Sequence, residues 1–213
     1  MKNFIVLDEF YDEPDYVRNL ALTSEWPKPS SAATYPGRNS ASSYYDEFVN
    51  NAVSEAVGQK LKPSEGQMNG GFRISLKGDT YKQDIHVDPM SENIWAGVLC
   101  LSKPEDCVDE NGYPIPMTVT WRHKELGWQR IPLNKEEGLQ YGYDTYQKIH
   151  NEIIEVDGID RSKWVPTNLT YMEYNKMVIF RPWMFHSAGV ADGLGTNLEN
   201  GRLMQIFFWS LDE

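Results

Sequence analysis

The run IWAGVLCLS at residues 94–102 is a short apolar segment between polar residues that favour turns. The same character recurs from residue 70 onward in GFRISL (71–76), MTVTWRH (117–123), NLTYMEY (168–174), KMVIFRP (176–182) and RLMQIFFWSL (202–211). Short runs rich in β-branched and aromatic residues, separated by Gly, Pro, Asn and Asp, are typical of β-strands. A series of such strands predicts a mainly β fold, either a barrel or a sandwich.

Helices are predicted on either side of this core. Residues 1–69 contain a short strand, a helix in DEPDYVRNLALTSEW (12–26) and a second helix in YYDEFVNNAVSEAVGQKL (44–61). The second helix carries Phe48, Val53 and Val57 near one face, and Gly58 near its end. The segment between the two helices, at 27–43, is rich in Pro, Ser and Gly and predicts a loop.

The predicted organisation is one domain over residues 1–213. The N-terminal strand and helices of residues 1–69 pack on an antiparallel β-barrel formed by residues 70–213. A helical insert at about 134–156, NKEEGLQYGYDTYQKIHNEIIEV, interrupts the barrel and is a candidate lid over its mouth.

Charge and hydropathy limit the partners of this chain. It has 20 basic and 31 acidic residues and a formal charge of −11, which disfavours nucleic-acid binding. The N-terminal apolar run is too short for a signal peptide, and no run approaches the roughly 18 apolar residues of a membrane span. Cys100 and Cys107 form no CxxC motif. We therefore expect a cytoplasmic protein without a membrane partner; the sequence sets no oligomeric state.

Three residues form a candidate metal site. In DIHVDPM (84–90), His86 and Asp88 stand two residues apart, so on a strand both side chains point to one face. His186 follows an apolar strand and precedes small residues in KMVIFRPWMFHSAG, where a barrel would turn it towards the mouth. Two imidazoles and one carboxylate leave coordination positions open, as in the facial triad of non-haem Fe(II) oxygenases. The alternative to a metal site is that His86 and Asp88 lie in a solvated turn and that His186 has a structural role.

Arg202 is a candidate anchor for an anion. It opens the strand RLMQIFFWSL and shares one face of it with Met204, Ile206 and Phe208. A guanidinium among apolar groups needs a partner. A dicarboxylate cosubstrate could supply one through two parallel hydrogen bonds. The alternative is an ion pair with one of the 31 acidic residues of the chain.

Four further residues are weaker candidates. Arg73 could be a second anion anchor, although we favour a surface charge on an edge strand. Trp121, Arg122 and His123, in the run TWRH, are candidates for lining the mouth of the barrel and contacting substrate. We interpret His123 as a polar residue of the rim rather than as a ligand.

The arrangement of these motifs resembles the iron(II)/2-oxoglutarate-dependent oxygenases, in particular the small prolyl-hydroxylase-like members of bacterial and phage type. The resemblance covers about residues 70–210, and the opening FIVLDEFYDEPDYVRNLAL (4–22) is also similar to the start of those small proteins. It implies a double-stranded β-helix, which is a jelly-roll, cupin-like barrel.

The resemblance also implies roles for single residues. His86, Asp88 and His186 would hold Fe(II), and Arg202 would pair with the distal carboxylate of 2-oxoglutarate. Tyr81 is a candidate for a tyrosine that often precedes the HxD pair in the family. With O2, such an enzyme would hydroxylate a small-molecule or peptidyl substrate and release succinate and CO2.

Two other interpretations remain open at this point. One is a metal-binding, cupin-like enzyme that does not use 2-oxoglutarate. The other is a non-enzymatic jelly-roll binding module, in which the aromatic residues would contact the ligand.

Overall fold

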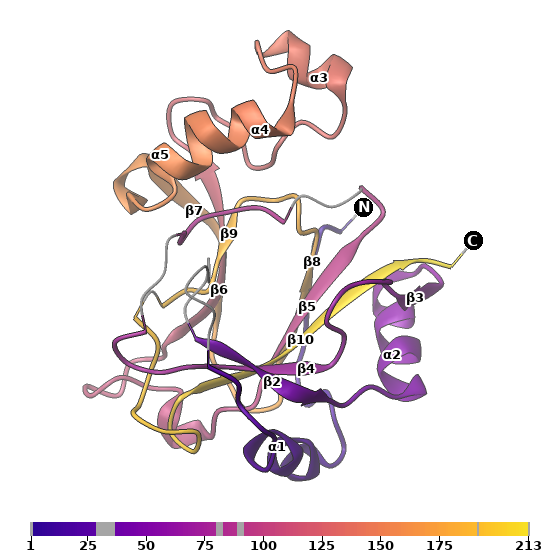
Figure 1. The fold of residues 1–213 in the computed structure, drawn as a ribbon, viewed down its shortest axis with the longest axis vertical. Helices are drawn as coiled ribbons and strands as arrows, with labels where there is room; N and C mark the ends of the chain where they lie inside the picture. Colours follow the sequence, from indigo (N-terminus) through magenta and orange to yellow (C-terminus); the bar gives the residue numbers. More distant parts are fainter. Residues whose placement is uncertain (1, 29–36, 80–82, 89–91, 191, 213) are drawn as a thin grey trace.

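Two antiparallel β-sheets face each other in the computed structural model of the chain (Figure 1), which describes residues 2–28, 37–79, 83–88, 92–190 and 192–212. The larger sheet has the order β1-β8-β5-β10-β4-β2, and β3 also pairs with β10. Its strands are β1 (Phe4–Leu7), β2 (Arg38–Ser43), β3 (Leu61–Pro63), β4 (Gly71–Ser75), β5 (Trp95–Cys100), β8 (Met177–Phe180) and β10 (Arg202–Leu211). The smaller sheet has the order β7-β6-β9, with β6 at Pro116–His123, β7 at Trp164–Tyr171 and β9 at His186–Ser187.

This two-sheet arrangement confirms the predicted mainly β, jelly-roll-like fold. The helices are α1 (Pro14–Leu22), α2 (Glu47–Val57), α3 (Lys135–Gln140), α4 (Tyr146–Ile149) and α5 (Glu155–Asp157), with a π-helical turn at His150–Ile154 between the last two. Short 3-10 turns lie at Pro104–Asp106 and Arg161–Lys163. The single-domain organisation stays a prediction.

Strand β10 shows why the larger sheet is buried on both faces. Leu203, Phe207 and Trp209 are fully buried in the cluster that includes residues of α1 and α2. The alternate residues Met204 and Phe208 belong to the cluster between the two sheets. Because successive side chains of a strand point to opposite faces, one apolar strand supplies both layers.

The two N-terminal helices cover the outer face of the larger sheet. Asp46 caps α2, because its side chain accepts a hydrogen bond from the backbone N–H of Val49 at 3.1 Å. Gly58 ends the helix with φ of 73°, a conformation that glycine adopts without steric cost. Val49 and Val53 are the fully buried residues, whereas Phe48 is 45% exposed, so the predicted apolar face was wrong at Phe48.

Two edge strands differ from the sequence prediction. Strand β2 lies in the segment predicted as a loop and pairs with β4, while its Ser-rich outer edge is mostly exposed. Strand β7 begins at Trp164 rather than at Asn168, and it includes Pro166. An edge strand tolerates polar residues and proline because one of its two backbone edges needs no strand partner.

The helical insert lies beyond the end of the smaller sheet where β7 begins (Figure 1), and it shares a buried apolar cluster with Val119 and Trp121 of β6. Ile149, Ile153 and Ile154 are buried there in one cluster with Ile85 and Val87. The insert therefore supports the segment DIHVD from behind. Among the described residues, no helix combines the length and the apolar character needed to cross a membrane.

Candidate active site

Backbone pairing brings His86 and His186 side by side. The two residues form an antiparallel bridge in which each backbone N–H donates to the carbonyl of the other at 2.9 Å. Residues directly opposite each other on adjacent strands carry neighbouring side chains. The ring centroids of the two histidines are accordingly 4.3 Å apart.

Each imidazole ring is oriented by a hydrogen bond of the same kind, to a backbone carbonyl two residues earlier in the chain. Nδ1 of His86 lies 2.8 Å from the carbonyl of Asp84, and Nδ1 of His186 lies 2.8 Å from the carbonyl of Met184. A carbonyl oxygen only accepts, so each Nδ1 carries a proton. In a neutral imidazole with this tautomer, the lone pair is on Nε2. Burial, and then the neighbouring His186, hold the pKa of His86 well below its ordinary value of 6.5. A neutral imidazole is the form that binds a metal.

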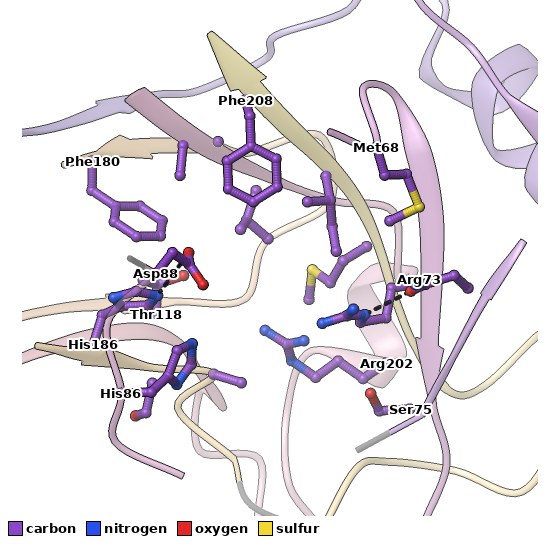
Figure 2. A pocket seen from close by; sticks show the side chains of 18 of the residues that line it. Met68, Arg73, Ser75, His86, Asp88, Thr118, Phe180, His186, Arg202 and Phe208 are labelled. Carbon is purple, nitrogen blue, oxygen red and sulfur yellow. Dashed lines mark hydrogen bonds and ion pairs between the residues drawn. The ribbon is translucent and has the colours of Figure 1, made fainter. Parts of the chain in front are cut away.

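Asp88 completes the cluster. Its backbone N–H donates to the carbonyl of Pro182 at 2.9 Å, and its Oδ2 lies 3.7 Å from Nε2 of His186. One ligand atom each from His86, Asp88 and His186 all lie within 4.8 Å of one another (Figure 2). Burial is the main cause that raises the pKa of Asp88, and a bound cation would favour its ionised form. The donor set of two imidazoles and one carboxylate fits Fe(II).

An ion pair secures the segment that carries His86. The carboxylate of Asp84 accepts two hydrogen bonds from Arg161, at 2.6 and 3.0 Å. Arg161 also donates to the carbonyl of Gly189 at 3.0 Å, just beyond His186. One guanidinium thus holds both ligand-bearing segments. This pair is not apparent from the sequence, because its members lie far apart along the chain.

Arg202 faces His86, Asp88 and His186 across a cavity of about 280 Å³. Met204, Ile206 and Phe208 line the same cavity, as the strand alternation predicted. Nη2 of Arg202 donates to the carbonyl of Met117 at 2.9 Å, whereas its buried Nε has no hydrogen-bond partner among the described residues. Burial lowers the pKa of Arg202 to about 10, so the side chain stays charged at neutral pH.

The unsatisfied Nε of Arg202 indicates a ligand. A buried donor without a partner costs about 1–3 kcal/mol, and more when it is charged. Within the described parts of the chain, Arg202 forms no ion pair with a carboxylate, so the alternative drawn from the sequence is not realised there. An anion that reaches Nε would satisfy the donor and balance the charge.

Arg73 lines the cavity rather than the protein surface. Strand β4 lies between β2 and β10, so it is not an edge strand. Nε of Arg73 donates to Oδ1 of Asn39 at 2.8 Å. The surface-charge interpretation of Arg73 was therefore wrong.

The candidates in TWRH lie elsewhere. Trp121 is buried behind the smaller sheet and donates to Oγ of Ser187 at 3.0 Å, while Arg122 is exposed. His123 is buried, and its Nε2 lies 3.0 Å from Oδ2 of Asp157. None of the three lines the described cavity, so the structure gives no support to their predicted contact with substrate. Tyr81 lies outside the described residues.

Comparison with known proteins finds similar folds among solved structures. No protein-family model matches the chain, and no curated protein matches it significantly. Among solved structures, SnoN, a non-haem α-ketoglutarate-dependent epimerase from nogalamycin biosynthesis, is 11% identical with a TM-score of 0.51, over 98% of this chain and 78% of SnoN. This likeness shows that the chain shares the fold of SnoN.

Two other solved structures are similar over nearly the whole chain. HygX from Streptomyces hygroscopicus, with nickel, 2-oxoglutarate and hygromycin B bound, is 10% identical with a TM-score of 0.49, over 98% of this chain and 83% of HygX. An N-substituted L-amino acid dioxygenase from Burkholderia ambifaria is 11% identical with a TM-score of 0.44, over 99% of this chain and 86% of that chain. A shared fold does not establish a reaction, so the residues of the site have to support the function.

Proposed function

We propose that the chain is an Fe(II)- and 2-oxoglutarate-dependent oxygenase that hydroxylates a small-molecule or peptidyl substrate. One observation carries this proposal: a His–Asp–His cluster faces a buried arginine, Arg202, that lacks a partner for its Nε among the described residues. The cluster suits an open Fe(II) site, and the arginine suits the distal carboxylate of a dicarboxylic acid.

His86, Asp88 and His186 would hold the metal. Their two imidazoles and one carboxylate come from one wall of the cavity, so the opposite side of a bound metal would stay accessible from the cavity. The bonds from both Nδ1 atoms to backbone carbonyls hold the rings in the ligating tautomer.

Arg202 would hold the cosubstrate. Its bond to the carbonyl of Met117 fixes the guanidinium, and its remaining donors can bind a carboxylate. When bound, Fe(II) and 2-oxoglutarate supply oxidation by O2: substrate C–H, 2-oxoglutarate and O2 are converted to C–OH, succinate and CO2. The apolar lining, which includes Phe180 and Phe208, would exclude water from this reaction.

Net charge guides the proposed choice of substrate. A formal charge of −11 disfavours a polyanionic nucleic acid, so we propose a small molecule or a peptide side chain.

Anaerobic titration of the full chain with Fe(II) and 2-oxoglutarate tests the proposal. We expect the weak visible charge-transfer band of the iron–cosubstrate chelate at about one equivalent of each. His86→Ala should abolish the band, whereas Arg122→Gln, a change at an exposed position that does not line the cavity, should keep it. Iron binding without the band would favour a metal enzyme that does not use 2-oxoglutarate. The absence of stoichiometric iron binding would favour a non-enzymatic binding module.

A further inference from the structure

A second guanidinium enters the cavity beside that of Arg202. In β4, Phe72 and Ile74 are fully buried in the cluster behind the larger sheet, so Arg73 between them points to the cavity side. Arg73 pairs in register with Met204, and Ser75 pairs with Arg202. The two arginines therefore reach the cavity from adjacent strands. Figure 2 shows both on the side opposite His86, Asp88 and His186.

Arg73 is held in place by the neighbouring strand β2. Its Nε donates to the amide oxygen of Asn39 at 2.8 Å. This bond orients the guanidinium, and the neutral amide adds no charge to the pair. The head group is therefore positioned before any ligand enters, which reduces the entropy that binding has to overcome.

The cosubstrate does not account for Arg73. In the proposed function, one carboxylate of 2-oxoglutarate goes to the metal and the other goes to Arg202. A second cation in the same cavity adds repulsion: burial first, and then Arg73 as a lesser cause, lowers the pKa of Arg202. Arg73 also lies nearer the outside than Arg202, since it is only partly buried whereas Arg202 is buried.

Apolar side chains share the cavity wall with Arg73. Met68, Ile206 and Phe208 line it together with Arg73. A cation among apolar groups fits a ligand that combines a carboxylate with a hydrocarbon part. Such a ligand could place its carboxylate on Arg73 and turn its C–H bonds towards the metal ligands across the cavity.

We propose that Arg73 binds the carboxylate of the substrate, and that the substrate is therefore a small organic acid with an apolar segment. This inference rests on the proposed function and narrows its substrate class. Arg73 is a substrate-binding residue in this scheme, distinct from Arg202 at the cosubstrate.

Paired probes test this assignment. The full chain is first loaded anaerobically with Fe(II) and saturating 2-oxoglutarate, and the visible band is recorded. Hexanoate or hexanamide, which differ only in the carboxylate, is then titrated by calorimetry. We expect hexanoate to bind at least about tenfold more tightly than hexanamide, since a charge-assisted bond is worth about 1.5–3 kcal/mol. Arg73→Gln should remove this preference, and Arg73→Lys should keep part of it.

Controls separate the possible failures. Arg122→Gln removes an exposed arginine away from the cavity and should keep the preference for hexanoate. Arg73→Gln should leave 2-oxoglutarate affinity within about twofold of wild type. If it weakens 2-oxoglutarate as strongly as Arg202→Gln does, Arg73 belongs to the cosubstrate site and the inference is overturned. Equal binding of the two probes, or no binding of hexanoate to the loaded protein, also overturns it. Absence of the band in the wild type overturns the proposed function itself, and this inference with it.

Discussion

At the scale of single residues, two kinds of polar contact shape the site. Backbone carbonyls close in the sequence orient the histidine rings, whereas the charged side chains interact with residues far away in the sequence. Each histidine ligand is oriented by a carbonyl two residues before it. The charged residues behave differently: Arg161 reaches Asp84 from a separate turn, and Arg202 keeps one buried donor without a partner among the described residues. Substitutions at these two arginines should therefore separate metal binding from cosubstrate binding.

Arg202→Gln should weaken 2-oxoglutarate binding by about 100-fold while iron affinity stays within about threefold of wild type. The change removes a charged, forked donor that can bind a carboxylate through two bonds, each worth about 1.5 kcal/mol or more. Anaerobic titration of the visible band gives both affinities. Unchanged 2-oxoglutarate affinity would contradict the role of Arg202 and favour a metal enzyme without this cosubstrate.

Arg161→Gln should lower Fe(II) affinity about tenfold, because it removes the outer support of the segment that carries His86. It also leaves the buried carboxylate of Asp84 without its cation. A double substitution with Asp84→Asn should recover part of the stability, since it removes the unpaired charge. Calorimetric iron titration and thermal unfolding of the three variants would check this. Strictly additive losses would argue against the pair acting as a unit.

At the scale of elements, the helical insert supports the ligand strand. Ile85 and Val87 alternate with His86 and Asp88, and they are buried in one cluster with insert residues such as Ile153. Among the described residues, none of the insert lines the cavity. The insert thus buttresses the segment that carries His86 and Asp88, and its role as a lid stays a prediction.

Ile153→Ala should destabilise the fold by about 3 kcal/mol and weaken iron binding, because the cavity it leaves lies behind the ligand strand. Val156→Ala, at a position that is 62% exposed, is the matched control and should change neither property. Denaturant unfolding and iron titration measure the two effects. Normal stability of Ile153→Ala with only substrate affinity reduced would favour a lid.

The stability of the fold should depend on pH through Glu137, which lies at the start of the insert. Arg130 donates to both carboxylate oxygens of Glu137, at 2.9 and 2.6 Å, and holds the pKa of Glu137 below its ordinary value of 4.5. A lowered folded-state pKa contributes stability above pH 4.5 that is lost as pH falls through the lowered value. Thermal unfolding between pH 7 and pH 3 should therefore show Glu137→Gln less stable than wild type at pH 7, with the gap closing below about pH 4.5. A difference in stability between Glu137→Gln and wild type that does not change with pH would contradict a stabilising ion pair between Arg130 and Glu137.

At the scale of the whole molecule, the site lies between the two sheets. The proposed metal ligands come from the smaller sheet and the segment beside it, whereas Arg202 and Arg73 come from the larger sheet (Figure 2). The bond from Arg202 to Met117 crosses between the sheets. A ligand that contacts both walls should therefore stabilise the complete fold.

Fe(II) at about 100 times its Kd should raise the midpoint of anaerobic thermal unfolding by about 5–10 °C, because binding only to the folded state adds about 2.7 kcal/mol. Chelation with EDTA should reverse the shift. His86→Ala should show no shift, and any equal shift in that variant would place the metal elsewhere.

The sequence by itself determined the features that depend on local periodicity. Alternation along RLMQIFFWSL and DIHVD assigned opposite faces to neighbouring side chains, and the structure shows those faces in β10 and beside His86. Tertiary structure alone decided which distant segments pair. The bridge between His86 and His186, the support of Asp84 by Arg161, and the turn of Trp121 and His123 away from the cavity all depend on how the sheets pack. Side-chain periodicity is a property of a few consecutive residues, whereas these contacts join segments that only the folded chain brings together.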